Sequence, residues 1–268
     1  MSEPGRSEQP PPKPPAKPPA KIEIRDLSVR YGAHTALRDV NLSIEPRSIH
    51  AFIGPAGSGK TSLLRVLNLL ATEVDGASVD GTVTLDGKHL LLGEVPLPSL
   101  RRRVGMVFAT PQPLPRSIYA NLTFGPRLAG VKRRAELDAV VEESLRAAQR
   151  WDEVKDRLDS SALKLSGGQQ QRLCVARSLA LKPEVLLLDE PCSGLDPIST
   201  LRIEQALEQL SAEITIVLVT NNTKQAARVG DRVAFFLLGE MVEDAPAESL
   251  FTAPKDQRTN DYLSGRFG

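Results

Sequence analysis

The octapeptide GPAGSGKT at residues 54–61 decides the fold of this chain. It fits the phosphate-binding pattern G-x-x-x-x-G-K-[ST], in which glycines let backbone N–H groups surround an anion. Residues 49–53 before it predict a strand, and apolar residues at helical spacing from Leu63 to Leu70 predict a helix after it. This order places the anion at a helix N-terminus and indicates an α/β fold. The weaker alternative is a glycine-rich turn that matches the pattern by chance.

A second motif, VLLLDE at residues 185–190, adds two carboxylates. Its continuous apolar run is typical of a parallel strand buried on both faces, and ligands of open α/β sheets lie beyond the carboxyl ends of such strands. We therefore expect Thr61 and Asp189 to bind Mg²⁺, Lys60 to reach the β- and γ-phosphates, and Glu190 to polarise the attacking water. The alternative is an acidic strand end exposed to solvent. Beside the phosphate loop, the motif favours an ATPase.

A third motif, LSGGQQQR at residues 165–172, precedes another helical stretch. Ser166 and Gln169 form a capping-box pattern, which predicts that the helix begins there. The glycine pair, Gly167 and Gly168, leaves backbone N–H groups accessible at the positive end of that helix. The motif therefore predicts a second anion site in the same chain.

Taken together, the motifs resemble those of ATP-binding subunits of the ABC transporter superfamily. Residues 165–172 resemble its signature motif, residues 193–196 its D-loop, and Tyr31 its adenine-stacking aromatic residue. The resemblance implies a head-to-tail dimer, either a homodimer or a heterodimer with a homologous ATPase, that closes on two ATP molecules with Mg²⁺. In that arrangement the signature of one chain completes the γ-phosphate site of the other. The expected ATP-contacting residues are Tyr31, Gly54, Pro55, Ala56, Gly57, Ser58, Gly59, Lys60, Thr61, Ser62, Ser166, Gly167, Gly168, Gln169 and Asp196.

Looser local matches, spread over residues 21–268, are similar to the ATPase subunits of phosphate-specific importers. The matching segments are residues 105–108, Pro115, residues 117–119, Asn121, residues 190–193, residues 261–262 and residues 265–266. This similarity implies a peripheral protein on the cytoplasmic face of the cell membrane, bound to integral membrane permease subunits through about residues 109–128. Its ATP-driven closure would drive the import of inorganic phosphate.

Two residues depart from the family pattern. Ala109 stands where the family has a glutamine that ligates Mg²⁺, and a methyl group neither coordinates a metal nor hydrogen-bonds a water. Gln112 replaces that glutamine only if the loop rearranges. Asn221 stands where the family has a histidine that holds the γ-phosphate and the water, and its amide donates a hydrogen bond but does not become a cation. We therefore count Asn221 among the catalytic residues and expect slow hydrolysis with nucleotide binding retained.

Composition and patterning set the domain organisation. The predicted fold is a P-loop NTPase (RecA-like) core with a parallel sheet, an N-terminal antiparallel β subdomain from Ile22 onward, and a helical subdomain at about residues 111–162. Residues 1–21 are proline-rich and are expected to form a disordered tail, so the ATP-binding domain spans residues 22–268. The net charge of +1 lacks the basic footprint of a nucleic-acid-binding protein. No apolar run has the length of a membrane-spanning helix, and no secretory signal begins the chain.

Three functions remain open at this stage. The first is an importing ATPase with weakened catalysis. The second is a catalytically degenerate regulatory subunit that binds nucleotide and pairs with a competent homologue; Ala109 and Asn221 favour it, while Glu190 and the complete signature oppose it. The third, a soluble ATPase acting on a macromolecule without a membrane partner, is the least favoured because the chain has a single cassette.

Overall fold

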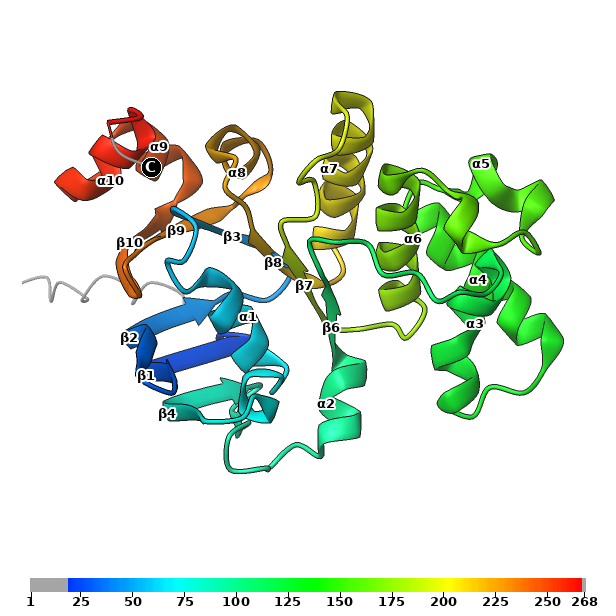
Figure 1. Ribbon diagram of the computed structural model, residues 1–268, viewed down its shortest axis with the longest axis horizontal. Coiled ribbons are helices and arrows are strands. Elements are labelled where there is room, and N and C mark those ends of the chain that lie inside the picture. Colours follow the sequence, from blue (N-terminus) through cyan, green and yellow to red (C-terminus); the bar gives the residue numbers. More distant parts are fainter. Residues whose placement is uncertain (1–18, 267–268) are drawn as a thin grey trace, which may run out of the picture.

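The computed structural model describes residues 19–266, which form two sheets and a group of helices (Figure 1). The proline-rich segment expected to be a disordered tail lies outside this range except for its last three residues. Lys21 already belongs to the folded part, because its backbone N–H donates to the Ile44 carbonyl at 2.8 Å.

The core sheet has six strands in the order β10-β9-β3-β8-β7-β6. Every neighbouring pair is parallel except β10 and β9, which are antiparallel. The strands are β10 (Glu240–Pro246), β9 (Arg232–Leu237), β3 (Ile49–Ile53), β8 (Thr215–Val219), β7 (Val185–Asp189) and β6 (Val104–Val107). All residues of β3, β7 and β8 are buried, as the continuous apolar runs predicted.

Alternate residues of these strands enter two different hydrophobic clusters, because successive side chains point to opposite faces of a sheet. On β7, Leu186 and Leu188 pack with the helices on one face. Val185 and Leu187 pack on the other face, with the helix that follows the phosphate loop and with a separate antiparallel sheet described below. The core sheet therefore forms the middle layer of the molecule.

The second sheet is antiparallel, with the strand order β2-β1-β4-β5. Its strands are β1 (Ile22–Tyr31), β2 (His34–Ile44), β4 (Ala77–Leu85) and β5 (Lys88–His89). The buried residues of β1 and β2 pack in the same cluster as α1, so this sheet lies beside α1 on one face of the core sheet (Figure 1). The predicted α/β core with an additional antiparallel sheet is confirmed.

The helices complete the layers on both faces. They are α1 (Lys60–Leu67), α2 (Leu97–Arg103), α3 (Ile118–Leu128), α4 (Arg134–Ala147), α5 (Trp151–Val154), α6 (Gly167–Leu179), α7 (Pro197–Ser211), α8 (Thr223–Val229), α9 (Ala247–Thr252) and α10 (Gln257–Leu263), with 3₁₀ turns at Ala71–Glu73, Lys155–Arg157 and Ala162–Lys164. Among residues 19–266, no helix has the length and apolarity that crossing a membrane requires.

The segment expected to be a helical subdomain contains α3, α4 and α5, which lie beside α6 at one end of the molecule (Figure 1). Leu137, Val141 and Leu145 form the buried stripe of α4, which packs in the same cluster as α6. The signature segment at the start of α6 is therefore supported by these helices.

The fully buried strand β7 offers a test of the layered core. Leu187 is fully buried, so Leu187→Ala is expected to lower the free energy of unfolding by about 2–5 kcal/mol, through lost apolar burial and the cavity left behind. Leu92→Ala is the matched control, because Leu92 is 74% exposed. Denaturant titration of both variants measures the effect, and an equal loss in the two would contradict this description of the core.

Candidate functional site

Three strand ends meet at one edge of the core sheet. β8 lies between β3 and β7 and is parallel to both, so the segments that follow these strands emerge side by side. Two backbone hydrogen bonds fix them: Glu190 N–H donates to the Val219 carbonyl at 2.8 Å, and Thr220 N–H donates to the Phe52 carbonyl at 3.1 Å. The phosphate loop, the acidic pair and Asn221 are brought together by this pairing.

Two glycines of the phosphate loop are required by space and by backbone conformation. Gly54 has φ 142° and Gly59 has φ 98°, values that favour glycine. A Cβ at Gly54 would lie 2.0 Å from the Phe236 carbonyl oxygen, and one at Gly59 would lie 2.4 Å from the Ala36 carbonyl oxygen. Gly59 is the N-cap of α1 and brings no side chain to that end. The N-terminus of α1 is thus left available to an anion.

The Lys60 side chain folds back into the phosphate loop, where we expect it to bind phosphate. Its Nζ donates to the carbonyl oxygens of Gly54 at 2.7 Å and Pro55 at 2.8 Å, and to the Ser58 hydroxyl at 3.1 Å. Burial lowers the pKa of Lys60 to about 8, against the opposing effect of the nearby Glu190 and Asp189 carboxylates. The ammonium group therefore lies among the polar groups of the loop, where a bound triphosphate would compete for these hydrogen bonds.

Thr61 and Asp189 form the predicted metal-binding pair. The Thr61 hydroxyl donates to Asp189 Oδ1 at 2.9 Å, which joins the first turn of α1 to the end of β7. A hydroxyl and a carboxylate are hard oxygen ligands that suit Mg²⁺. No group of three or more His, Cys, Asp or Glu side chains in the described chain has the geometry to hold a metal by itself. The pair fits a Mg²⁺ ion whose other ligands are phosphate oxygens and waters.

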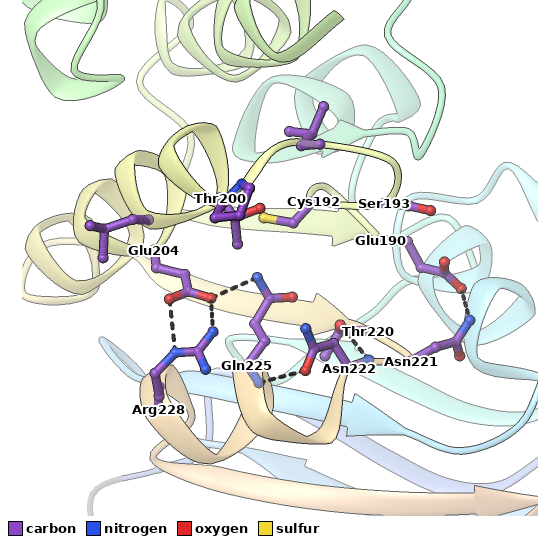
Figure 2. A pocket seen from close by; sticks show the side chains of 13 residues that line it. Glu190, Cys192, Ser193, Thr200, Glu204, Thr220, Asn221, Asn222, Gln225 and Arg228 are labelled. Atoms are coloured by element: carbon purple, nitrogen blue, oxygen red, sulfur yellow. Dashed lines mark hydrogen bonds and ion pairs between the residues drawn. The ribbon is translucent and has the colours of Figure 1, made fainter.

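Glu190 and Asn221 contact each other directly. The Asn221 amide donates from Nδ2 to Glu190 Oε1 at 2.5 Å, and Figure 2 shows the two side chains directed toward each other at one end of a cavity. Glu190 also has φ 46°, in the left-handed region that is unfavourable for a residue with a side chain. The position of the Glu190 side chain is therefore restricted by its own backbone conformation and by its hydrogen bond with Asn221.

The cavity beside this pair has a volume of about 640 Å³ and is lined by α7, α8 and the ends of β7 and β8 (Figure 2). Its buried carboxylate, Glu204, is paired with Arg228 at 2.6 Å and accepts from Gln225 at 3.2 Å. Burial raises the pKa of Cys192, which also lines the cavity, to about 11, so the thiol is protonated and unreactive at neutral pH. The cavity provides space for water next to Glu190.

The nucleotide pocket contains two residues that the sequence did not single out. A space of about 250 Å³ is lined by Tyr31, by residues 56–62 of the loop and by Glu190, together with His34 and Ala36. His34 pairs with Tyr31 across the tight turn between β1 and β2, which brings its side chain to the mouth of the pocket. The sequence feature that indicates this position is the two-residue turn at Gly32 and Ala33, because it places His34 opposite Tyr31.

The predicted signature residues lie outside the nucleotide pocket of the same chain. Ser166 is the N-cap of α6, and its backbone N–H donates to Gln169 Oε1 at 3.1 Å, as the capping box predicted. Asp196 is the N-cap of α7, where hydrogen bonds from the Ser199 hydroxyl and backbone N–H lower its pKa. Within the described part of the chain, the residues that line the nucleotide pocket include neither the signature nor Asp196. One chain therefore has two separate candidate anion sites.

Residues 108–112, which include Ala109 in place of the expected glutamine, are hydrogen-bonded to α6 at both ends. Gln171 Nε2 donates to the Phe108 carbonyl at 2.9 Å, and Arg177 Nη1 donates to the Gln112 carbonyl at 2.8 Å. Gln112 is exposed, and neither Ala109 nor Gln112 is among the described residues that line the nucleotide pocket. For Gln112 to reach the phosphate loop, this anchored segment has to move.

A family model described as ABC transporter matches residues 37–193, more than half of the chain. The chain belongs to the ABC transporter family. It is 52% identical over 247 residues to the Phosphate import ATP-binding protein PstB 2 of Bacillus subtilis (strain 168), with 92% of each chain covered. The protein is accordingly an ABC-type ATPase, an ATP-hydrolysing enzyme.

Two solved structures share the fold of this ABC ATPase. cbiO1 from Clostridium perfringens, part of the ABC transporter complex cbiONQ, has a TM-score of 0.76 at 24% identity, covering 91% of this chain and 95% of that chain. A bacterial Atm1-family ABC exporter with ATP bound has a TM-score of 0.76 at 22% identity, covering 92% of this chain and 42% of the exporter. The predicted P-loop NTPase fold is confirmed by these matches.

The lowered pKa of Lys60 predicts how ATP binding depends on pH. Below about pH 8 the free protein already carries the proton, so Lys60 takes up none on binding. Above pH 8 the triphosphate draws a proton onto Lys60, and affinity falls by up to about tenfold per pH unit. Calorimetry at pH 7 and pH 9, in buffers of different ionisation enthalpy, measures the uptake. Lys60→Arg is the control, because a guanidinium stays charged throughout; uptake that persists in this variant would contradict the assignment.

Proposed function

We propose that this ABC ATPase is the ATP-hydrolysing subunit of an importer for inorganic phosphate. The observation that carries the proposal is the 52% identity, over 92% of both chains, to a protein named as a phosphate import ATP-binding protein. The phosphate loop, the metal-binding pair and Glu190 support ATP hydrolysis as the source of energy. The transported ion itself would be recognised by other subunits.

In the proposed reaction, the backbone N–H groups of residues 54–61 and the Lys60 ammonium hold the β- and γ-phosphates. Thr61 and Asp189 would hold Mg²⁺, which neutralises charge on the phosphates. Glu190 accepts a proton from the attacking water and orients it toward the γ-phosphorus. Tyr31 supports the adenine ring from the end of β1, where it lines the same pocket.

The separation of the two anion sites supports a head-to-tail dimer, either a homodimer or a heterodimer with a homologous ATPase. Ser166 and Gly167 are exposed at the start of α6, away from the pocket of their own chain. In the proposed dimer, the backbone N–H groups at this helix start, together with Ser166 and Gln169, bind the γ-phosphate held by the partner. Asp196, at the start of α7, connects the two sites.

A patch on α3 supports docking to integral membrane permease subunits at the cytoplasmic face of the cell membrane. Phe124 is 42% exposed and Leu128 is 76% exposed. Both line a hollow of about 310 Å³, together with the arginine pair at residues 101–102 and Arg177. Apolar side chains beside guanidinium groups suit a protein partner with an amphipathic helix. The ATPase would then be held peripherally, through its permease.

Hydrolysis in this importer is proposed to be slow. Ala109 supplies no metal ligand, and Asn221 already uses its amide on Glu190 at 2.5 Å. Removing one preorganised donor near developing charge costs about 10²–10³ in rate. The same Asn221–Glu190 contact favours the second candidate function, a regulatory subunit that binds nucleotide but turns over too slowly to drive transport.

Restoring the two family residues tests the cause of slow turnover. Ala109→Gln with Asn221→His is expected to raise steady-state ATP hydrolysis by at least about tenfold, because the two restored groups stabilise one transition state and their effects do not add. Gln112→Ala is the control and should leave turnover unchanged, since Gln112 lies outside the pocket. A loss in this control would show that Gln112 replaces the missing glutamine.

Phosphate uptake tests the proposed function itself. Vesicles that contain the cognate permease and this ATPase, loaded with Mg–ATP, should accumulate labelled phosphate when the matching binding protein is supplied. Lys60→Ala should abolish accumulation, because the triphosphate loses its main cationic contact. Binding of the ATPase to the permease without ATP-dependent accumulation would favour the regulatory function.

A further inference from the structure

Three arginines from three parts of the chain converge on one carboxylate. Glu153, on α5, accepts hydrogen bonds from Arg150 at the start of the same helix, from Arg172 on α6 at 2.9 Å, and from Arg202 on α7. Gln169 of the signature also approaches it, with Nε2 donating at 3.4 Å. This Glu153 cluster joins the helical segment to the signature helix and to α7.

The cluster has an excess of positive charge in a buried place. Arg150 is 1% exposed and Arg172 is 3% exposed. Within residues 19–266, Nε and Nη2 of Arg150 and Nε and Nη1 of Arg172 have no hydrogen-bond partner. Burial lowers the pKa of Arg150 to about 10, so its guanidinium is still charged at neutral pH. Three guanidinium groups and one carboxylate leave the cluster with net positive charge, and buried charge that is incompletely paired is unfavourable, so an additional anion would stabilise it.

The nearby acidic groups do not supply the missing charge. Asp152 is paired with Lys155 at 3.4 Å, and Glu142 is paired with Arg146 at 2.7 Å. Asp196 accepts hydrogen bonds from the Ser199 backbone N–H and hydroxyl at the start of α7. Three guanidinium groups therefore share the single carboxylate of Glu153 in the described chain.

An open groove of about 450 Å³ lies against the cluster. Its lining comes from the end of α4, from α5 and from α7: Arg146, Gln149, Arg150, Trp151, Asp152, Glu153, Arg202 and Gln209. The side chain of Arg202 is 42% exposed and that of Arg146 is 57% exposed, so both are accessible from solvent. The groove thus presents two accessible guanidinium groups and two amides beside the buried Arg150, together with the Asp152 carboxylate, which is paired with Lys155.

We propose that this groove binds a phosphate-class oxyanion, free inorganic phosphate, and that the bound anion supplies the counter-charge of the Glu153 cluster. Guanidinium groups match tetrahedral oxyanions because their N–H donors are arranged as a fork. The groove shares no lining residue with the nucleotide pocket. It therefore forms an anion site distinct from both the phosphate loop and the signature, where α4 and α5 meet the helix that Asp196 begins. This site does not depend on the proposed transport function.

Phosphate binding to the full-length protein tests the site directly. Calorimetric titration with inorganic phosphate is done with Mg–ADP saturating the nucleotide pocket and with ionic strength matched by chloride. Arg202→Gln is expected to weaken binding by at least about tenfold, since it removes an accessible charge-assisted donor. Arg133→Gln is the matched control, because Arg133 is 80% exposed and pairs only with Glu136 at 3.2 Å. Equal binding by wild type and Arg202→Gln would overturn the proposal.

Arg150→Leu gives an independent result. It removes one of the three guanidinium charges that share Glu153, so it should raise the melting temperature in phosphate-free buffer and reduce the further rise that phosphate produces in the wild type. If this variant does not fold, the Arg202→Gln titration still decides the question. A melting temperature of the wild type that phosphate raises no more than chloride does would contradict the proposal.

The phosphate group of a lipid headgroup is the other oxyanion that this groove could bind. Sedimentation with phosphatidylcholine vesicles containing phosphatidic acid separates the two sources. The proposal expects no Arg202-dependent binding to these vesicles. Arg202-dependent vesicle binding in the absence of binding to free phosphate would overturn it in favour of a membrane contact.

Discussion

The parallel pairing of β3, β8 and β7 is the constraint on which the site depends. Because β8 lies between the other two strands, the segment that follows β8 emerges between the segments that follow β3 and β7. Asn221 is thereby placed within 2.5 Å of Glu190, while Thr61 reaches Asp189 at 2.9 Å from the start of α1. Layers of apolar side chains on both faces hold this edge rigid, and the chemistry is confined to the loops that follow it.

The polar and charged side chains at this edge are hydrogen-bonded to other groups of the chain. Lys60 donates to the carbonyls of its own loop, and Asn221 donates to Glu190. A bound triphosphate competes with the first contact and the attacking water with the second. The first exchange is favourable because the phosphates bring negative charge to a buried ammonium group. The second is less favourable, because a neutral amide offers the water and the γ-phosphate less than an imidazolium would. The proposed combination of retained nucleotide binding and slow hydrolysis would follow from this one arrangement.

Much of this architecture was predictable from the sequence, because strands such as Val185–Asp189 are continuous apolar runs between clear loop motifs. The phosphate loop and the capping box at Ser166 are local patterns whose residues are adjacent in the chain. His34 was missed because its position depends on the register between β1 and β2. The Glu153 cluster was also missed, since Arg150, Arg172 and Arg202 are far apart in sequence and no periodic pattern connects them. Such contacts are set by how helices pack, which the sequence alone does not specify.

The role of Glu190 as the general base is tested by the rate at which pre-bound Mg–ATP is cleaved in a single turnover, compared between the wild type and Glu190→Gln. Nucleotide affinity is measured on the same samples. We expect equal affinity in the two proteins and cleavage about 10²-fold faster in the wild type, at the lower end of what general base catalysis contributes. Equal cleavage rates in the two proteins would show that Glu190 has no part in the reaction.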